Sequence, residues 1–139
     1  MRRTIMLVGL IVAPLLGSCG QSQVQATGTP FFSTHTYRFS ALGGYTGQLV
    51  MSDKCLWIQS SGGRVLPIWP AALHVRVTAT GVEIEDQQGK VVAVTGERLR
   101  VAARDATATE IREFIDAAAP SPCRGAATIV IGLIEPAPN

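Results

Sequence analysis

The sequence predicts a mainly β fold: a small antiparallel barrel or sandwich of about six to eight strands with one amphipathic helix. Three observations support it. From residue 48 onward, apolar runs of about five residues alternate with turn residues, which is the spacing of small barrels and sandwiches. The runs 55–59 and 126–134 are apolar on both faces, as in strands buried between two layers. The stretch 108–119 has helical periodicity instead.

The strands are expected in a regular order after an ambiguous start. In the stretch 31–47, Tyr37 and Phe39 alternate with polar residues and allow a short strand, which the following glycines would end. The remaining strands are expected at 48–51, 55–59, 64–69, 73–78, 82–86, 90–95, 98–103 and 126–134. Pro67 marks its run as an edge strand or a bulge, because proline has no N–H to donate. The runs between 73 and 103 are expected to form a meander.

Alternation along these strands separates a core face from a solvent face. The side chains expected inside are Leu73, Val75, Val77, Val82, Ile84, Leu99, Val101 and Ala103. Those expected outside are His74, Arg76, Glu83, Glu85, Arg98, Arg100 and Arg104. The outer face should therefore carry opposite charges in contact with water.

The predicted helix has clear signals at both ends. Thr107 and Glu110 form a capping box, in which each side chain satisfies a free backbone N–H of the first turn. The apolar face is expected to be Ile111, Phe114, Ile115 and Ala118. Pro120 and Pro122 end the helix.

The N-terminus has the pattern of an export signal. Two arginines follow Met1, and residues 5–16 form an uncharged apolar run of twelve residues. This run is too short to cross a bilayer as a helix, which needs about 20 residues. Leu16-Gly17-Ser18-Cys19 then resembles a bacterial lipobox. That resemblance implies cleavage before Cys19 and attachment of acyl chains such as palmitate to it. The alternative is an ordinary signal peptide that a cysteine happens to follow.

These features predict a signal peptide at 1–18, a lipidated N-terminus and flexible tether at 19–30, and a single domain at 31–139. Two of the twelve Lys and Arg residues belong to the predicted signal, leaving ten against ten Asp and Glu. Nucleic-acid binding requires a surplus of basic residues, so a neutral mature chain argues against it.

Three cysteines are present, and their positions suggest different roles. If Cys19 carries lipid, Cys55 and Cys123 form an even pair in an oxidising compartment and are expected to make a disulfide. The alternative is two free thiols. A thioredoxin-like site is not expected, because the sequence has no C-x-x-C motif.

Motifs for catalysis, metal binding and cofactors are missing from the sequence. His35 and His74 are the only histidines, and the sequence shows no cluster of three or four His, Cys or carboxylate residues at the spacing of a zinc site, so each is interpreted as a surface or packed side chain. No serine-nucleophile motif, phosphate loop or dinucleotide fingerprint occurs. Glu83, Glu85 and Asp86 are candidate paired carboxylates, but an outward strand face normally carries such residues.

Two tryptophans and one arginine are candidates for packing or recognition. Trp57 is expected in the core beside the disulfide. Trp69, between two prolines, is either a core residue or part of a partner surface together with Arg64. The outward Arg98, Arg100 and Arg104 would either meet an anionic partner or, with nearby glutamates, form a solvated face.

The stretch from residue 48 onward resembles small exported bacterial β-rich proteins. The motifs shared with them are Gly47-x-Leu49, Cys55-Leu56, Pro67-Ile68-Trp69-Pro70, Gly89, Gly96 and Cys123. The helix departs from that pattern. The resemblance implies an exported β domain and brings no known activity.

The sequence thus predicts an envelope-anchored lipoprotein that is not an enzyme and needs no cofactor. It would act as a binding or structural module for an envelope protein or a small ligand. One alternative is an inhibitor of a secreted hydrolase of the lysozyme or protease type, with a loop around 60–64 inserted into the enzyme. A further alternative is an enzyme that uses scattered carboxylates.

Overall fold

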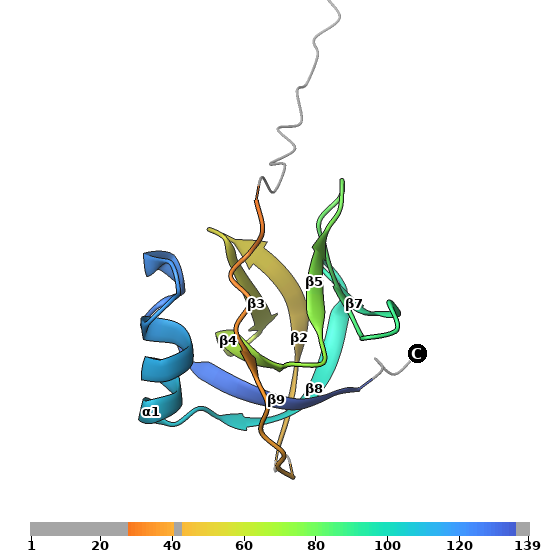
Figure 1. Ribbon diagram of the computed structural model, residues 1–139. Helices are drawn as coiled ribbons and strands as arrows, with labels where there is room; N and C mark the ends of the chain where they lie inside the picture. The colour runs from red at the N-terminus through yellow and green to blue at the C-terminus, as the bar shows by residue number, and fades with distance from the viewer. Residues whose placement is uncertain (1–27, 41–42, 136–139) are drawn as a thin grey trace, which may run out of the picture.

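The computed structural model describes residues 28–40 and 43–135 (Figure 1). The predicted signal peptide, Cys19 and most of the predicted tether lie outside these ranges. Within the described ranges, nine strands form two sheets: β1 (Thr34–His35), β2 (Gly43–Ser52), β3 (Cys55–Ser60), β4 (Gly63–Pro70), β5 (His74–Val77), β6 (Val82–Glu85), β7 (Val91–Val94), β8 (Arg98–Asp105) and β9 (Thr128–Glu135). The mainly β prediction is confirmed. No helix of this part of the chain is long and apolar enough to cross a membrane.

Five strands form a closed ring of pairings in the order β2–β3–β4–β9–β8, with β8 pairing back to β2. Four of the pairs are antiparallel, and β4 and β9 close the ring in parallel. This connectivity is that of OB-type five-stranded Greek-key barrels. The likeness concerns strand order alone and carries no function by itself.

β2 is one long bent strand, and the glycines expected to precede it lie inside it. Its first half, Gly43–Gln48, pairs with β8, and its second half, Gln48–Ser52, pairs with β3. At Gly47 a Cβ atom would lie 2.5 Å from the carbonyl oxygen of Gln59, so only glycine fits this close approach. The strand expected around Tyr37 and Phe39 is wrong: β1 precedes them and pairs in parallel with β4.

Pro67 does not mark an edge strand, because β4 is paired on both sides. Leu66 N–H donates to Ala127 on the β9 side, and Trp69 N–H donates to Ser33 of the β1 segment. The backbone nitrogens of Pro67 and Trp69 point to the same side of β4, because the two residues are two positions apart. On that side, Pro67 lies between the end of the pairing with β3 at Val65 and the start of the pairing with β1. The proline is tolerated because its missing N–H would point into the space where those two partners diverge.

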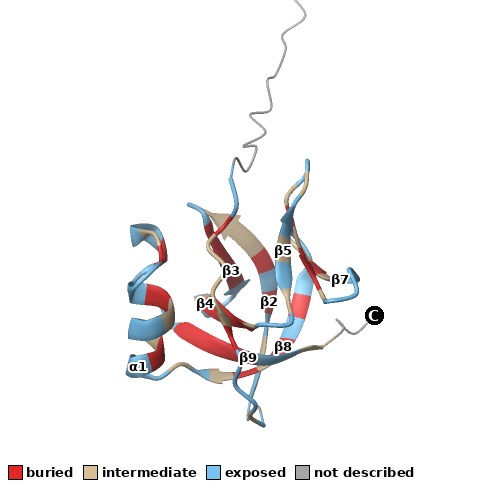
Figure 2. Ribbon diagram, viewed as in Figure 1, coloured by how far each residue is buried: buried red, intermediate tan, exposed pale blue. Residues whose placement is uncertain are grey.

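Two apolar clusters explain why β3 and β9 are apolar on both faces. The barrel interior takes Leu56 and Ile58 from β3 and Ile129 and Ile131 from β9. The outer faces of the same strands form a second cluster beneath the helical segment. Its buried members are Cys55, Trp57, Leu66, Ile68, Ile115, Ala119, Cys123 and Val130. Figure 2 shows buried positions on both the barrel strands and the helix.

The second sheet, β5–β6–β7, lies on the other side of the barrel from the helix (Figure 1). Val82, Ile84 and Ala93 pack into the interior cluster, so this sheet helps to cover the barrel. The expected meander therefore stops at β7, and β8 returns to pair with β2 and β9. Two predicted side-chain positions are wrong. Val77 was expected inside but is 39% exposed, and Glu85 was expected outside but is only 8% exposed.

The helical segment begins as predicted but turns more widely than expected. The capping box of Thr107 and Glu110 is present at the start of α1 (Ala108–Glu110), which continues as the π-helical η1 (Ile111–Asp116). A short 3-10 turn, η2 (Ser121–Cys123), follows. The wider π turn moves the buried face by one residue, so Ala119 is buried instead of Ala118.

Candidate functional site

Four polar side chains lie in one row across four neighbouring barrel strands. The strand register pairs Arg98 with Gln48, Gln48 with Gln59, and Gln59 with Arg64. We call these four residues the Arg–Gln row. Directly paired residues point to the same face of a sheet, and all four are exposed. With a strand spacing of about 4.8 Å, the row extends over roughly 14 Å.

Two hollows lie near this row. The larger has a volume of about 450 Å³, and its side chains come from Thr46, Gln48, Gln59, Ser60, Ser61 and Arg98. The smaller, of about 270 Å³, is lined by Arg64 together with more apolar groups, among them Tyr45, Ile58 and Val65. Thr46 and Ser60 line both hollows. Tyr45, Ile58 and Val65 pack in the interior cluster, so the smaller hollow opens on the interior-facing side of these strands, and the row lies beside the larger one.

The backbone and its hydrogen bonds hold the lining groups in place. The side-chain amide of Gln48 donates to the carbonyl of Gly96 over 2.7 Å, which fixes its orientation. The Ser60 hydroxyl donates to the Gly63 carbonyl at 3.2 Å and accepts from the Gly62 N–H at 3.3 Å. These two contacts make the β3–β4 turn compact. The amide oxygen of Gln48 and the Gln59 amide form no hydrogen bond with another residue in the described ranges.

The row is cationic at both ends. Three other arginines are neutralised: Arg76 by Glu83 and Glu85, Arg100 by Glu135, and Arg104 by Glu110. Arg98 and Arg64 form no ion pair with any residue in the described ranges. The Arg64 guanidinium lies 4.2 Å from the centroid of the Trp57 ring, a cation–π contact that limits where this charge can sit.

Tyr45 contributes an uncharged group to the smaller hollow. Its hydroxyl donates to a carboxylate oxygen of Asp105 over 2.6 Å. This hydrogen bond raises the pKa of Tyr45, and partial burial and the negative charge of Asp105 act in the same direction. The phenol is therefore held protonated, with its ring facing the hollow.

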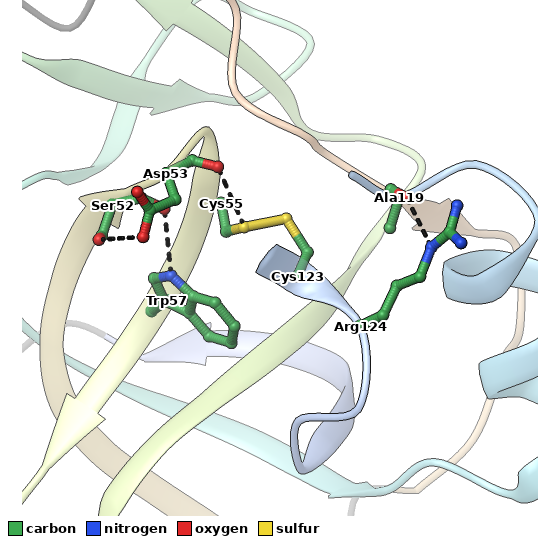
Figure 3. The surroundings of a disulfide bond; sticks show 7 residues. All are labelled: Ser52, Asp53, Cys55, Trp57, Ala119, Cys123 and Arg124. Carbon is green, nitrogen blue, oxygen red and sulfur yellow. Dashed lines mark hydrogen bonds between the residues drawn. A yellow bond between two sulfur atoms is a disulfide. The ribbon is translucent and has the colours of Figure 1, made fainter. Parts of the chain in front are cut away.

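The predicted pair Cys55 and Cys123 forms a disulfide, with a Cα–Cα distance of 5.6 Å (Figure 3). Trp57 lies in the same buried cluster, as expected, and its indole N–H donates to the Ser52 carbonyl. The assignment of Trp69 to a partner surface is wrong. Trp69 is 1% exposed and stacks on Phe32 inside the barrel cluster. Arg64 is at the surface and belongs to the row.

Both histidines are engaged in local contacts. His35 is buried, its Nε2 lies 2.7 Å from the Ile131 carbonyl, and its Nδ1 accepts from the Tyr37 N–H. The second contact requires a bare Nδ1, so Nε2 carries the proton. His74 lies 3.0 Å from a Glu85 oxygen at the surface. Among the residues that the structure describes, no group of three or more potential metal ligands comes together.

The candidate carboxylates lie away from the row and have partners. Glu83 and Glu85 form ion pairs with Arg76, and Glu85 also contacts His74. Asp86 accepts the N–H groups of Gln88 and Lys90, both at 2.9 Å, and so shapes the β6–β7 turn. These contacts give the carboxylates a structural role.

The two glutamines of the row were missed by the sequence analysis, although a signal exists. Asp53 and Lys54 form a two-residue turn between β2 and β3, with Ser52 opposite Cys55. Such a turn fixes the register, and counting back from it places Gln48 opposite Gln59. The Ser61-Gly62 turn in the same way places Arg64 opposite Gln59. Only the position of Arg98 depends on longer-range pairing that the sequence does not show.

The chain matches no known protein-family model, and comparisons with curated proteins and with solved structures find no significant match. No function is therefore carried over from a relative.

Proposed function

We propose that this chain is a lipoprotein of a bacterial envelope and that its β domain is a non-enzymatic binding module. The lipid on Cys19 would hold the protein at a membrane, and residues 20–30 would serve as the tether. The Arg–Gln row would be the binding surface. The domain would thus act by holding a ligand or partner near the membrane.

Two features support the envelope location. The first is the order of basic start, short apolar run and Leu-Gly-Ser-Cys at the N-terminus. The second is the Cys55–Cys123 disulfide, since stable disulfides are typical of oxidising compartments outside the cytoplasm.

The observation that carries the binding role is the Arg–Gln row itself. Its two amides and two guanidinium groups lie on paired barrel strands, so their spacing is set by a rigid backbone. Hydroxyl groups of Thr46, Ser60 and Ser61 surround them in the larger hollow. Such a set of hydrogen-bonding groups in a concave surface is suited to binding.

A hydrolase inhibitor is the second candidate. The β3–β4 turn is exposed at Ser61, Gly62 and Gly63, and the Ser60 hydrogen bonds make it compact. Rigid exposed turns are suited to insertion into an enzyme, because little conformational entropy is lost on binding. A panel of secreted lysozymes and proteases tests this function. Inhibition that Arg64→Ala abolishes would favour it over passive binding.

The anchor is tested by the intact mass of the detergent-extracted protein without reductant. We expect a chain that begins at Cys19, carries acyl mass and lacks two hydrogens for the disulfide. A Cys19→Ala variant should remain uncleaved or become soluble. Acyl mass on this variant, or a variant that is cleaved and still attached to the membrane, would refute the lipoprotein proposal.

The binding surface is tested by photocrosslinking in living cells. A diazirine side chain at Gln59 should capture a specific adduct, because this position lies at the centre of the row. The matched control is Gln88, an exposed glutamine in the β6–β7 turn. Equal labelling from both positions, or no adduct from Gln59, would contradict the proposal.

A further inference from the structure

We propose that the Arg–Gln row recognises an acidic oligosaccharide, with anionic groups at its ends and sugar hydroxyls between them. This inference rests on the proposed binding function and specifies its ligand.

The ends of the row supply the charge preference. Arg98 and Arg64 stand at the two outer strands, and neither forms an ion pair with a described residue. A guanidinium group binds carboxylate or sulfate oxygens through two parallel hydrogen bonds. The two arginines are separated by two intervening strands, so they fit separate anionic groups on one chain better than a single small anion.

The centre of the row suits a polyol. A glutamine amide offers both donors and an acceptor, which matches adjacent sugar hydroxyls that also donate and accept. Gln59 presents such an amide, and beside it Gln48 offers its amide oxygen and one N–H, because the other N–H donates to the Gly96 carbonyl. Ser60, Ser61 and Thr46 add hydroxyl groups around them.

The backbone argues for a sugar chain over an extended peptide. Peptides that bind sheets usually do so by main-chain hydrogen bonds to a free strand edge. Here β2 is paired with both β3 and β8 at Gln48, and β3 is paired with both β2 and β4 at Gln59. Recognition at the centre of the row must therefore use side chains.

Calorimetry on the full detergent-extracted protein tests the inference. The probes are a galacturonic acid hexamer, a sulfated hexasaccharide and the neutral methyl ester of the first. At low ionic strength we expect at least one acidic probe to bind, and the ester to bind about tenfold more weakly or not at all. Neither acidic probe binding, or equal binding of the ester, would overturn the proposed ligand class.

Two variants with the same loss of charge locate the site. Arg98→Gln should weaken binding of the acidic probe about tenfold, because one charge-assisted contact is lost. Arg112→Gln removes an exposed arginine of η1, away from the row, and should leave binding unchanged. Equal effects of the two variants would overturn the inference. If all probes fail but crosslinking at Gln59 succeeds, only the ligand class is wrong; if both fail, the proposed function fails as well.

Discussion

Arg104 and Glu110 form a two-bonded ion pair that joins β8 to the start of the helix. Arg104 Nη1 donates to Glu110 Oε2 over 2.8 Å, and Nη2 donates to Oε1 over 2.6 Å. Glu110 Oε2 also accepts the Thr107 N–H over 2.8 Å. The Arg104 hydrogen bonds, more than the capping contact, lower the pKa of Glu110 to about 2 although burial opposes the shift.

This ion pair predicts a loss of stability in acid. Because the pKa of Glu110 is lower in the folded protein than its ordinary value of 4.5, its stabilising effect is complete above that value and is lost as the pH falls towards 2. The effect is on the order of 2–3 kcal/mol. Free energies of unfolding measured from pH 7 to pH 2 should show Glu110→Gln with a shallower acid dependence than the wild type.

The control for this prediction is Glu113→Gln, which alters an exposed carboxylate on η1. Its acid dependence should follow that of the wild type. Parallel curves for Glu110→Gln and the wild type would show that the ion pair does not stabilise the fold.

Gly47 is predicted to be intolerant of any side chain. A Cβ atom there would lie 2.5 Å from the Gln59 carbonyl oxygen and 2.8 Å from Ile58 Cγ2, so β2 and β3 would have to separate. Gly47→Ala should lower the free energy of unfolding by about 2–3 kcal/mol, measured by urea denaturation. Gly43→Ala is the matched control, since its nearest atom, the Ala103 carbonyl oxygen, is 3.6 Å away. Equal stability of the two variants would contradict the prediction.

Local signals in the sequence predicted the elements that local chemistry determines. The start of the helix follows from the Thr107–Glu110 capping box, which needs only four consecutive residues. The burial of β3 could be predicted because consecutive residues of the strand are apolar on both of its faces. Trp57 faces the helix layer, and Ile58 faces the barrel interior. The disulfide follows from an even count of cysteines once Cys19 is assigned to lipid.

Features that depend on distant partners were predicted poorly. Whether Pro67 lies at an edge depends on where β3 ends and β1 begins along β4, which is a relation between three separate segments. The burial of Trp69 also depends on a distant segment, because the Phe32 ring that stacks on it comes from the chain just before β1. The Arg–Gln row requires the order of four strands, so no single stretch of sequence contains it.

The disulfide is predicted to be a major source of stability. It closes a sequence separation of 68 residues and ties β3 to η2, beyond the helix. The double variant Cys55→Ala/Cys123→Ala should lose roughly 4 kcal/mol, measured by urea denaturation. A reductant should destabilise the wild type and leave the double variant unaffected. Equal stability of wild type and variant would show that the second apolar cluster holds the helix without the bond.

A substitution in the β2–β3 turn is predicted to stabilise the protein. Asp53 and Lys54 both have left-handed backbone angles, with φ of 52° and 64°. Such two-residue turns favour glycine at the second position, because a Cβ atom is strained there. Lys54→Gly should therefore raise the free energy of unfolding by about 1 kcal/mol, since relief of strain exceeds the entropy that glycine adds to the unfolded chain. The Phe31 N–H would still donate to the carbonyl of residue 54.

The control is Lys90→Gly, which changes an exposed residue outside the left-handed region and should lower the free energy of unfolding. A gain in stability there as large as at Lys54 would contradict this explanation.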